Sequence, residues 1–362
     1  MNRYSRRQYL QALFATSVFL ALYQQRLSKS ESSVSKPAGS SIWQLGIGAD
    51  PARFLWETQK SPAVEELVLS WSPQFLTGWL NSFDHRQGDL SFWRTWHQQD
   101  LLSAWFSQGY GLQVITWEND EVLPTGDYHI SQQYLEDLEE LAGYIREANP
   151  QGQPTYWTLA TEFSYWRLPA DTYNATTAKY YQALMQNLLQ ARAVIKRQLP
   201  NAWVAPSWGG WIVTFDYPSQ GGGRSMIPPF APMLEQMDGI AFQSMRPTPA
   251  GEYNPELKRP DPGNPEQIRQ CCEVFSRYSK SLMVSHYEPA IKDSHPNGGR
   301  ADTVTRDFAI MSGPAWLKTV TSLGLNKFSL MHYGLYKGNP YNALDAAHTF
   351  KTVLQEGQWA LG

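Results

Sequence analysis

The chain is poor in cysteine and has no excess of basic charge. Its 362 residues include 2 cysteines, the adjacent Cys271 and Cys272, and 30 Lys and Arg against 33 Asp and Glu. Adjacent cysteines are poorly spaced for an unstrained disulfide, so we expect no structural bridge. A formal net charge of -3 offers no basic surface for a phosphate backbone, which argues against nucleic acid as a partner. Because no disulfide is expected, the fold must be stabilised by a hydrophobic core.

Signals for metals and cofactors are also missing from the sequence. No group of Cys and His residues has the spacing of a zinc site. The turn Gly46-Ile47-Gly48 lacks the third glycine of a dinucleotide-binding motif. We therefore expect a protein that uses neither a metal nor a cofactor.

The N-terminal segment has an apolar run that is too short for an ordinary membrane span. This run covers 10–23, whereas a spanning helix needs about 20 apolar residues. Arg6 and Arg7 precede it, as in a twin-arginine export signal. We predict a signal and Ser-rich linker over 1–41 and a folded domain over 42–362. The protein is then exported to the periplasm or the medium, and an uncleaved signal would be its one link to the membrane. A frayed amphipathic N-terminus is the alternative.

Aromatic residues are abundant. They make up 14% of the chain, with 15 Trp and 19 Tyr. Flat amphipathic rings fill cores, and they also line binding clefts. We expect most of them in the core. The remainder suit sugars, whose rings have apolar C–H faces edged by hydroxyls, so a carbohydrate is the partner we expect.

From residue 43 onward, short apolar runs alternate with segments of helical periodicity. We predict strands at 43–47, 67–71, 112–118, 155–162, 203–208, 239–245, 282–288 and 328–334. We predict helices at 92–108, 131–148, 176–199, 232–237, 265–279, 303–323 and 341–355. Strands that alternate with helices imply a parallel sheet, and eight such units favour closure into a (β/α)8 TIM barrel. The alternative is an open doubly wound sheet, which commonly has a Gly-rich phosphate-binding turn after its first strand. The turn at 46–48 lacks that pattern.

In such barrels the catalytic and binding groups come from the carboxyl ends of the strands. Here those ends are polar and aromatic. The candidate substrate-binding residues are Trp71, Trp117, Glu118, Trp166, Trp208, Gln243, His286, Tyr287, His332 and Tyr333. The tryptophans, together with Trp211, are candidate sugar platforms. Burial beneath the rim loops is an equal alternative for each of them.

Two glutamates are the strongest catalytic candidates. Glu162 ends the fourth predicted strand and Glu288 ends the seventh. With a period of two, positions 158, 160 and 162 share one face, and positions 282, 284, 286 and 288 share another. We expect both faces to point into the barrel. The alternative is a surface ion pair with Arg167, Arg246 or Lys292.

A pair of carboxyl groups has a specific use in glycoside cleavage. A retaining enzyme holds them about 5 to 5.5 Å apart, so that one attacks the anomeric carbon and the other protonates the leaving oxygen. An inverting enzyme spaces them about 6.5 to 9.5 Å apart to admit water. The acid must stay protonated near neutral pH, and the nucleophile must stay ionised.

From residue 43 to its end the chain resembles clan A, the retaining (β/α)8 glycoside hydrolases. These enzymes carry an acid/base at the end of strand four and a nucleophile at the end of strand seven. The stretches VITWE at 114–118 and EFSYW at 162–166 are most similar to family 26 mannanases and related β-glycanases. The resemblance implies a retaining hydrolase of β-linked glycans, with Glu162 as the acid/base and Glu288 as the nucleophile.

The sequence departs from that pattern at three strand ends. Ala160-Thr161 precedes Glu162, where many clan members carry Asn and family 26 carries His. Gln243 stands on strand six in place of Tyr, and strand eight ends in His332-Tyr333 without the usual Trp. A barrel that has kept aromatic platforms and lost catalytic alignment would fit these departures. A non-catalytic glycan-binding or polysaccharide-processing accessory barrel is therefore the second hypothesis.

Overall fold

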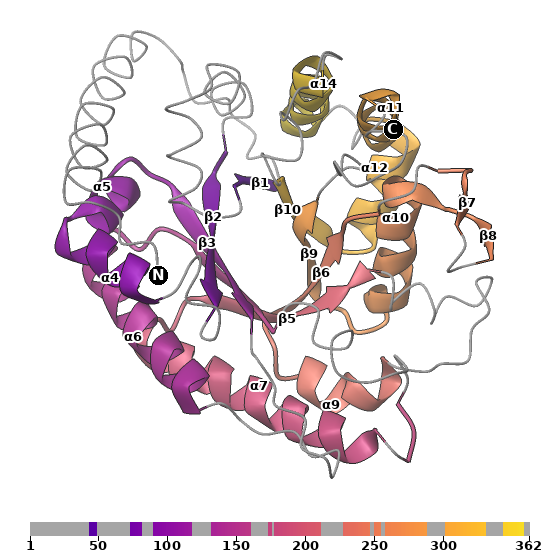
Figure 1. The fold of residues 1–362 in the computed structure, drawn as a ribbon. Coiled ribbons are helices and arrows are strands. Elements are labelled where there is room, and N and C mark those ends of the chain that lie inside the picture. The colour runs from indigo at the N-terminus through magenta and orange to yellow at the C-terminus, as the bar shows by residue number, and fades with distance from the viewer. Residues whose placement is uncertain are drawn as a thin grey trace, which may run out of the picture.

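Eight parallel strands close into a barrel (Figure 1). Around the ring their order is β1-β10-β9-β6-β5-β4-β3-β2, so neighbours in sequence are neighbours in space. The strands are β1 (Gln44–Ile47), β2 (Phe75–Asn81), β3 (Gly111–Trp117), β4 (Thr155–Leu159), β5 (Trp203–Gly209), β6 (Gly239–Ser244), β9 (Ser281–Tyr287) and β10 (Leu325–Leu330). A short antiparallel hairpin, β7 (Tyr253–Asn254) and β8 (Arg259–Pro260), follows β6. The prediction of a (β/α)8 TIM barrel is confirmed.

Helices form an outer ring around the strands (Figure 1). They are α4 (Leu90–Gln98), α5 (Leu101–Ser107), α6 (Gln132–Ala148), α7 (Ala178–Gln198), the 3-10 turn η2 (Pro228–Phe230), α9 (Ala231–Leu234), α10 (Gly263–Ser276), α11 (Ala301–Met311), α12 (Pro314–Ser322) and α14 (Ala343–Glu356). Two segments that we predicted as single helices are each broken in two. Asp100 adopts a left-handed φ of 57° between α4 and α5. Pro314 begins α12 after Gly313, because proline favours a first helical position.

This computed structural model describes residues 43–48, 73–81, 90–117, 132–160, 173–175, 177–210, 227–246, 250–254, 258–287, 301–330 and 343–357. The predicted signal and linker over 1–41 lie outside these ranges. Within them, no helix combines the length and apolarity that a membrane crossing would require.

The second strand lies elsewhere than we predicted. We placed it at 67–71, a segment outside the described residues, whereas the strand between β1 and β3 is Phe75–Asn81. Its inward positions carry Phe75, Thr77 and Trp79. Trp71 therefore precedes strand two instead of following it, and the argument that placed Trp71 on the catalytic rim was wrong.

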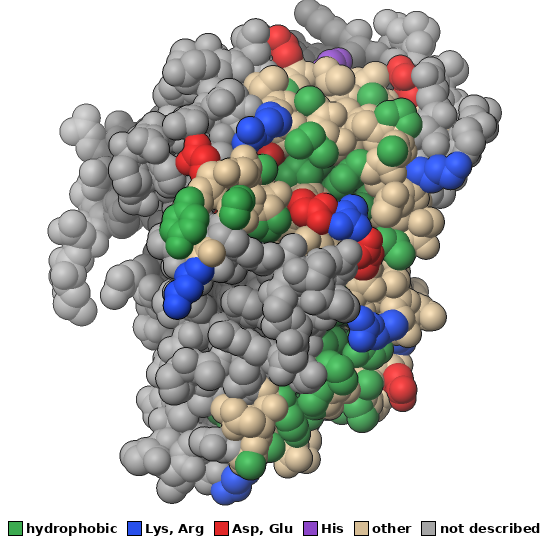
Figure 2. Space-filling model, turned by 90° about the vertical axis from the view of Figure 1, so that its right-hand side faces the viewer, with side chains coloured by type: hydrophobic (Ala, Val, Ile, Leu, Met, Phe, Trp, Pro, Cys, Tyr) green, Lys and Arg blue, Asp and Glu red, His purple; other side chains and the backbone are tan. Residues whose placement is uncertain are grey.

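Opposite charges lie next to each other on the described part of the face shown in Figure 2. On α10, Arg269 pairs with Glu266 at 2.6 Å and also with Glu273. Such mixed pairs leave no broad basic area among the described residues of this face.

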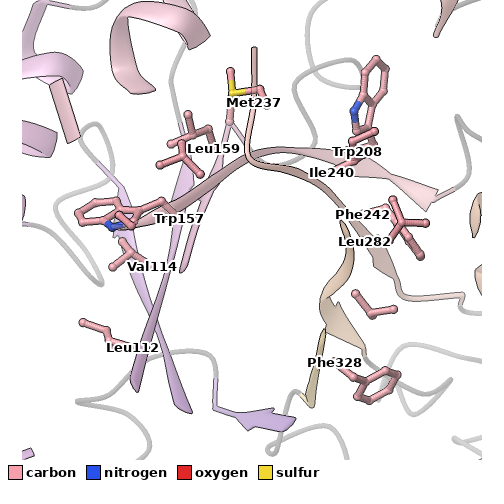
Figure 3. Packing of buried hydrophobic residues seen from close by; sticks show 14 of the residues in the cluster. Leu112, Val114, Trp157, Leu159, Trp208, Met237, Ile240, Phe242, Leu282 and Phe328 are labelled. Carbon is pink, nitrogen blue, oxygen red and sulfur yellow. The ribbon is translucent and has the colours of Figure 1, made fainter. Parts of the chain in front are cut away.

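The main core lies between the strands and the helices. Figure 3 shows that its strand residues, such as Trp157, Trp208 and Phe242, point away from the barrel axis. The ring of Trp208 meets Phe230 and Phe275, with centroids 4.8 and 5.8 Å away. The tryptophans of this outer core are Trp43, Trp93, Trp96, Trp157, Trp208 and Trp316, with Trp105 packed against it. Burial of such large rings is a dominant stabilising contribution.

A second, smaller apolar cluster fills the barrel interior near the amino ends of the strands. We call it the lower layer, and it consists of Phe75, Tyr156, Ala205, Ala241 and Met283. Glycine makes room for its large rings. A Cβ atom at Gly46 would lie 2.0 Å from the ring of Phe75, so any larger residue there would collide.

Lys327 lies on β10 beside Met283 of this layer, and its side chain extends to Ser281 at the amino end of β9. Its ammonium group donates hydrogen bonds to Ser281 Oγ at 2.7 Å and Asn326 Oδ1 at 2.8 Å, and it lies 4.9 Å from the ring centroid of Trp203. Burial lowers the pKa of Lys327 to about 8. These polar and aromatic groups fill the end of the barrel opposite the predicted catalytic rim.

Candidate active site

The strands predicted to carry the two glutamates are the fourth and seventh of the barrel. β4 ends at Leu159, three residues before Glu162, and β9 ends at Tyr287, directly before Glu288. All barrel strands are parallel, so the ends of β4 and β9 lie on one rim. The two glutamates themselves lie outside the described residues. So do Trp71, Glu118, Trp166, Trp211, His332 and Tyr333, as does the side chain of Trp117.

A layer of buried polar side chains lies inside the barrel just beneath this rim. We call it the upper layer, and it consists of Thr77, Gln113, Thr158, Ser207, Gln243, Ser285, His286 and Ser329. Most of these residues follow a lower-layer residue by two positions on the same strand. Because alternate residues of a strand share a face, both layers point inward. Thr158 is therefore inside the barrel, as its strand pattern predicted.

Hydrogen bonds join the upper layer across the barrel. Gln113 Oε1 accepts a bond from Thr77 at 2.9 Å, while its Nε2 donates to Thr158 Oγ1 at 3.3 Å and to the Ser285 carbonyl at 2.8 Å. The hydroxyls of Ser207 and Ser285 are 3.1 Å apart. Buried polar groups are tolerated when they are bonded in this way. The layer is thus a connected polar floor under the rim.

His286 and Gln243 form the part of this floor nearest to strand seven. His286 Nε2 bonds to Gln243 Oε1, and Nδ1 lies 3.0 Å from Ser285 Oγ. With the carboxamide oxygen opposite Nε2, the neutral ring carries its proton on Nε2. Burial lowers the pKa of His286 to about 3, so the ring stays neutral at ordinary pH. Both side chains are 1% exposed. Direct contact with substrate remains a prediction for both residues.

An extra residue in β9 changes which side chains face inward. Val284 pairs with Phe242 of β6 and Phe328 of β10, but the next pairs are Gln243 with His286 and Leu330 with Tyr287. β9 is therefore one residue longer than both neighbours at this point, which is a β-bulge. Ser285 and His286 both face the interior as a result.

The bulge corrects our expectation for the amino-terminal half of β9. Leu282 and Val284 belong to the outer core, while Met283 belongs to the lower layer. We predicted that positions 282 and 284 share the inward face of position 286. That is wrong for 282 and 284, since the bulge inverts the alternation between them and His286.

Tyr287 and Trp208 were predicted to bind substrate, and the structure contradicts both. Each is 0% exposed and points outward into the helix layer. Tyr287 packs against Phe308 and Phe328, with centroids 5.7 and 5.3 Å away. Trp208 follows the inward Ser207, so alternation directs it to the outer core. An aromatic residue at a strand end faces the barrel axis only when its position alternates in step with the inward residues of that strand.

Trp79 has such a position, and sequence reasoning missed it. It follows Phe75 and Thr77 at intervals of two on β2, and its ring centroid lies 5.9 Å from that of His286. Unlike the residues below it, Trp79 is only half-buried. Its indole therefore lies at the top of the polar floor. A correct position for strand two would have revealed it from the same period of two.

The end of β4 is a sharp turn. Ala160 adopts a left-handed φ of 49°, a conformation that L-residues other than glycine seldom take. Its N–H donates a 3.2 Å bond to Thr116 Oγ1 of β3, which holds the turn in place. The strand alternation therefore ends at Leu159, and the predicted continuation of the inward face through position 160 is wrong. Strained backbone of this kind is common next to functional residues.

Solved structures of several enzymes have a similar fold. A GH53 catalytic domain from Ignisphaera aggregans has a TM-score of 0.54 at 14% identity, over 88% of this chain and 98% of that chain. A mutant xylanase A of P. fluorescens subsp. cellulosa, in complex with xylopentaose, has a TM-score of 0.52 at 11% identity, over 86% and 97%. The catalytic domain of a β-amylase from Paenibacillus polymyxa has a TM-score of 0.51 at 12% identity, over 88% and 99%.

At these identities the likeness establishes the barrel fold and does not select a substrate, since the three proteins carry three different names. No protein-family model matches the chain, and a sequence search of curated proteins gave no match.

Proposed function

We propose that this protein is a retaining glycoside hydrolase that cleaves a β-linked polysaccharide or oligosaccharide by double displacement. Glu162 is the acid/base and Glu288 is the nucleophile. One observation carries the proposal: in a closed parallel barrel, the fourth and seventh strands end on the same rim, and each is followed within three residues by a glutamate.

The bulge in β9 supports the role of Glu288. Tyr287 points outward, so continued alternation directs the next side chain inward, over the polar floor. In a regular strand of the same length, alternation from the inward Met283 would direct position 288 toward the helices. His286 and Gln243 lie at this place in the floor, and their neutral dipoles add no second negative charge near the nucleophile.

Trp79 supports a sugar-binding role for the same rim. A half-buried indole offers a flat face to the C–H side of a sugar ring, and polar groups around it fix the orientation of the ring. Trp79 thus replaces Trp71 and Trp208 as the described platform. The resemblance to family 26 makes a β-mannan the first substrate to test, with xylan and β-glucan next.

The chemistry takes two balanced steps. A carboxylate oxygen of Glu288 attacks the anomeric carbon, the glycosidic bond breaks, and the proton of Glu162 passes to the leaving oxygen. A glycosyl ester on Glu288 results. Water then attacks the same carbon, Glu162 accepts its proton, and the bond to Glu288 breaks. Two inversions give net retention, which requires carboxyl groups about 5 to 5.5 Å apart.

The test is hydrolysis of an aryl β-glycoside with a good leaving group. Glu288→Ala should lower kcat by about 10⁴-fold or more, and added azide should restore turnover by forming a glycosyl azide. Glu162→Ala should keep the first step with this substrate, because the leaving group needs no proton, and should slow cleavage of a polysaccharide. Glu235→Ala, at an exposed position after α9, is the matched control and should behave as the wild type.

Three results would count against the proposal. Unchanged turnover by Glu288→Ala would reject the nucleophile. A product of inverted configuration from the wild type would reject double displacement. Binding of a glycan without turnover of any substrate would instead support the second hypothesis, an accessory barrel that binds glycans.

A further inference from the structure

The end of β9 is held from its outer side by a buried carboxyl group. Tyr287, the last residue of the strand, donates a hydrogen bond from its hydroxyl to Asp307 Oδ2 of α11 at 3.1 Å. Its ring is fixed by Phe308 and Phe328. The backbone from which position 288 continues is therefore tied to α11 through both the ring and the hydroxyl of Tyr287.

The same carboxyl group links β9 to the end of β6. Asn264, in the first turn of α10, donates from Nδ2 to Asp307 Oδ2 at 3.1 Å. Its Oδ1 accepts bonds from Ser244 Oγ and from the Arg246 N–H, each at 2.9 Å. The ends of strands six and seven are thus connected through two buried side chains, Asn264 and Asp307.

Burial of the Asp307 carboxyl group costs free energy. Asp307 is 1% exposed, the described residues give it no salt bridge, and its Oδ1 is buried without a hydrogen-bond partner among them. Burial raises the pKa of Asp307 to about 6; the charge of Asp261 adds to this rise, and bonds from Asn264 and Tyr287 with the charge of Arg306 oppose it. Asp261 is itself paired with Arg246. An apolar residue of similar size would avoid this cost, so packing alone does not account for a carboxyl group here.

We propose that Asp307 is a positioning residue: by holding Tyr287 on the outer face of β9, it sets the direction in which Glu288 leaves the strand. The inference rests on the proposed function for its kinetic readout. Adjacent Cα atoms are about 3.8 Å apart, so a rotation of about 15° at Tyr287 moves the next Cα atom by about 1 Å. A misplacement of about 1 Å in a catalytic group costs up to about 100-fold in rate.

The first test compares two substitutions at the same position. Asp307→Ala removes the acceptor, and we expect kcat per folded molecule to fall about 10- to 100-fold with KM nearly unchanged. Asp307→Asn keeps an acceptor oxygen for Tyr287 and Asn264, and it should restore kcat to within about threefold of the wild type. Asp345→Asn, at an exposed position of α14, is the control and should leave the kinetics unchanged. Equal kcat in Asp307→Ala and the wild type would overturn the proposal, since a merely structural role lowers stability and not turnover.

A second test does not depend on activity. Hydrogen exchange at the amides of β9 nearest to Tyr287 should quicken in Tyr287→Phe, which removes only the hydroxyl, while the amides at the end of β5 keep their wild-type rates. This variant also serves if Asp307→Ala fails to fold. Unchanged exchange in Tyr287→Phe would overturn the positioning role. If the wild type hydrolyses no glycoside, the proposed function fails, and the exchange result alone decides whether Asp307 holds the end of the strand.

Discussion

The lower and upper layers of the barrel interior lie two residues apart on the same strands, yet their chemistry is opposite. The lower layer consists of rings and small apolar groups, and the upper layer consists of hydroxyls, carboxamides and one imidazole. Both are buried. Apolar filling stabilises by transfer from water, whereas a polar layer at best compensates its own desolvation by hydrogen bonds. The difference shows that the amino end of the barrel interior is filled by stabilising apolar groups, while the end beneath the proposed catalytic rim holds oriented polar groups.

Removal of a lower-layer ring should have the largest effect. Tyr156 packs against Phe75 and Trp203, with centroids 4.9 and 6.2 Å away. Tyr156→Ala should lower the free energy of unfolding by about 3 to 5 kcal/mol, measured by urea denaturation, and leave kcat per folded molecule unchanged. The control, Tyr156→Phe, loses only the 2.7 Å bond to Gln44 Oε1 and should cost about 1 kcal/mol. Equal losses in the two variants would show that the lower layer does not act as a packed core.

The pH dependence of stability should show that His286 of the upper layer is buried and uncharged. The pKa of His286 falls from 6.5 to about 3 on folding, so its contribution to stability is present above pH 6.5 and is lost as the pH falls toward 3. Between pH 7 and pH 4.5 the wild type should lose roughly 3 kcal/mol more than His286→Asn. Denaturant titrations at several pH values measure this difference. Parallel curves for the two proteins would mean that His286 is not desolvated in the native state.

Giving one position of each layer the residue type of the other layer should have the smallest effect on stability. Ala205 and Ser207 are inward neighbours on β5, one in each layer. Ala205→Ser places a hydroxyl among apolar groups and should cost about 1 to 3 kcal/mol. Ser207→Ala removes one partner of Ser285 and should cost about 1 kcal/mol. Thermal unfolding of both variants measures the two costs, and a stabilising Ala205→Ser would contradict the assignment of the lower layer as apolar.

The barrel could be predicted from the sequence because the patterns that indicate its strands and helices are local. Apolar runs followed by helical periods gave seven of the eight strands near their observed places. The fourth and seventh strands, which precede Glu162 and Glu288 in the sequence, were among them, but β4 ends at Leu159, three residues before the predicted end. The second strand was missed because 67–71 begins with three consecutive aliphatic residues and ends in Trp71, whereas Phe75–Asn81 contains Thr77 and Gly78 and has weaker local propensity. That error concealed Trp79.

The direction of each side chain was harder to predict, since it depends on pairing between strands. Trp208 and Ser207 are adjacent, and their residue types do not determine which of the two side chains faces the barrel axis. Tyr287 was misassigned because it was chosen as an aromatic residue at a strand end, although alternation with positions 286 and 288 directs it outward. The directions of Leu282 and Val284 were wrong because the bulge at Ser285 and His286 is defined only by register with β6 and β10. The role of Asp307 depends on α11 packing beside β9, a contact between distant parts of the chain.

The bulge in β9 has a consequence for how such a barrel can change over evolution. Loss of the codon for Ser285 or His286 would remove the extra residue, and the pairing of Tyr287 with β10 and its outward direction would be kept. Substitutions that flatten the bulge without removing a residue would have a different result, because the end of β9 would slip by one position against both neighbours. The tyrosine would then turn toward the barrel axis, and the side chain after it would turn toward the helices. Two proteins of the same length and architecture could thus differ in which side chain they present above the barrel through the pairing of one strand.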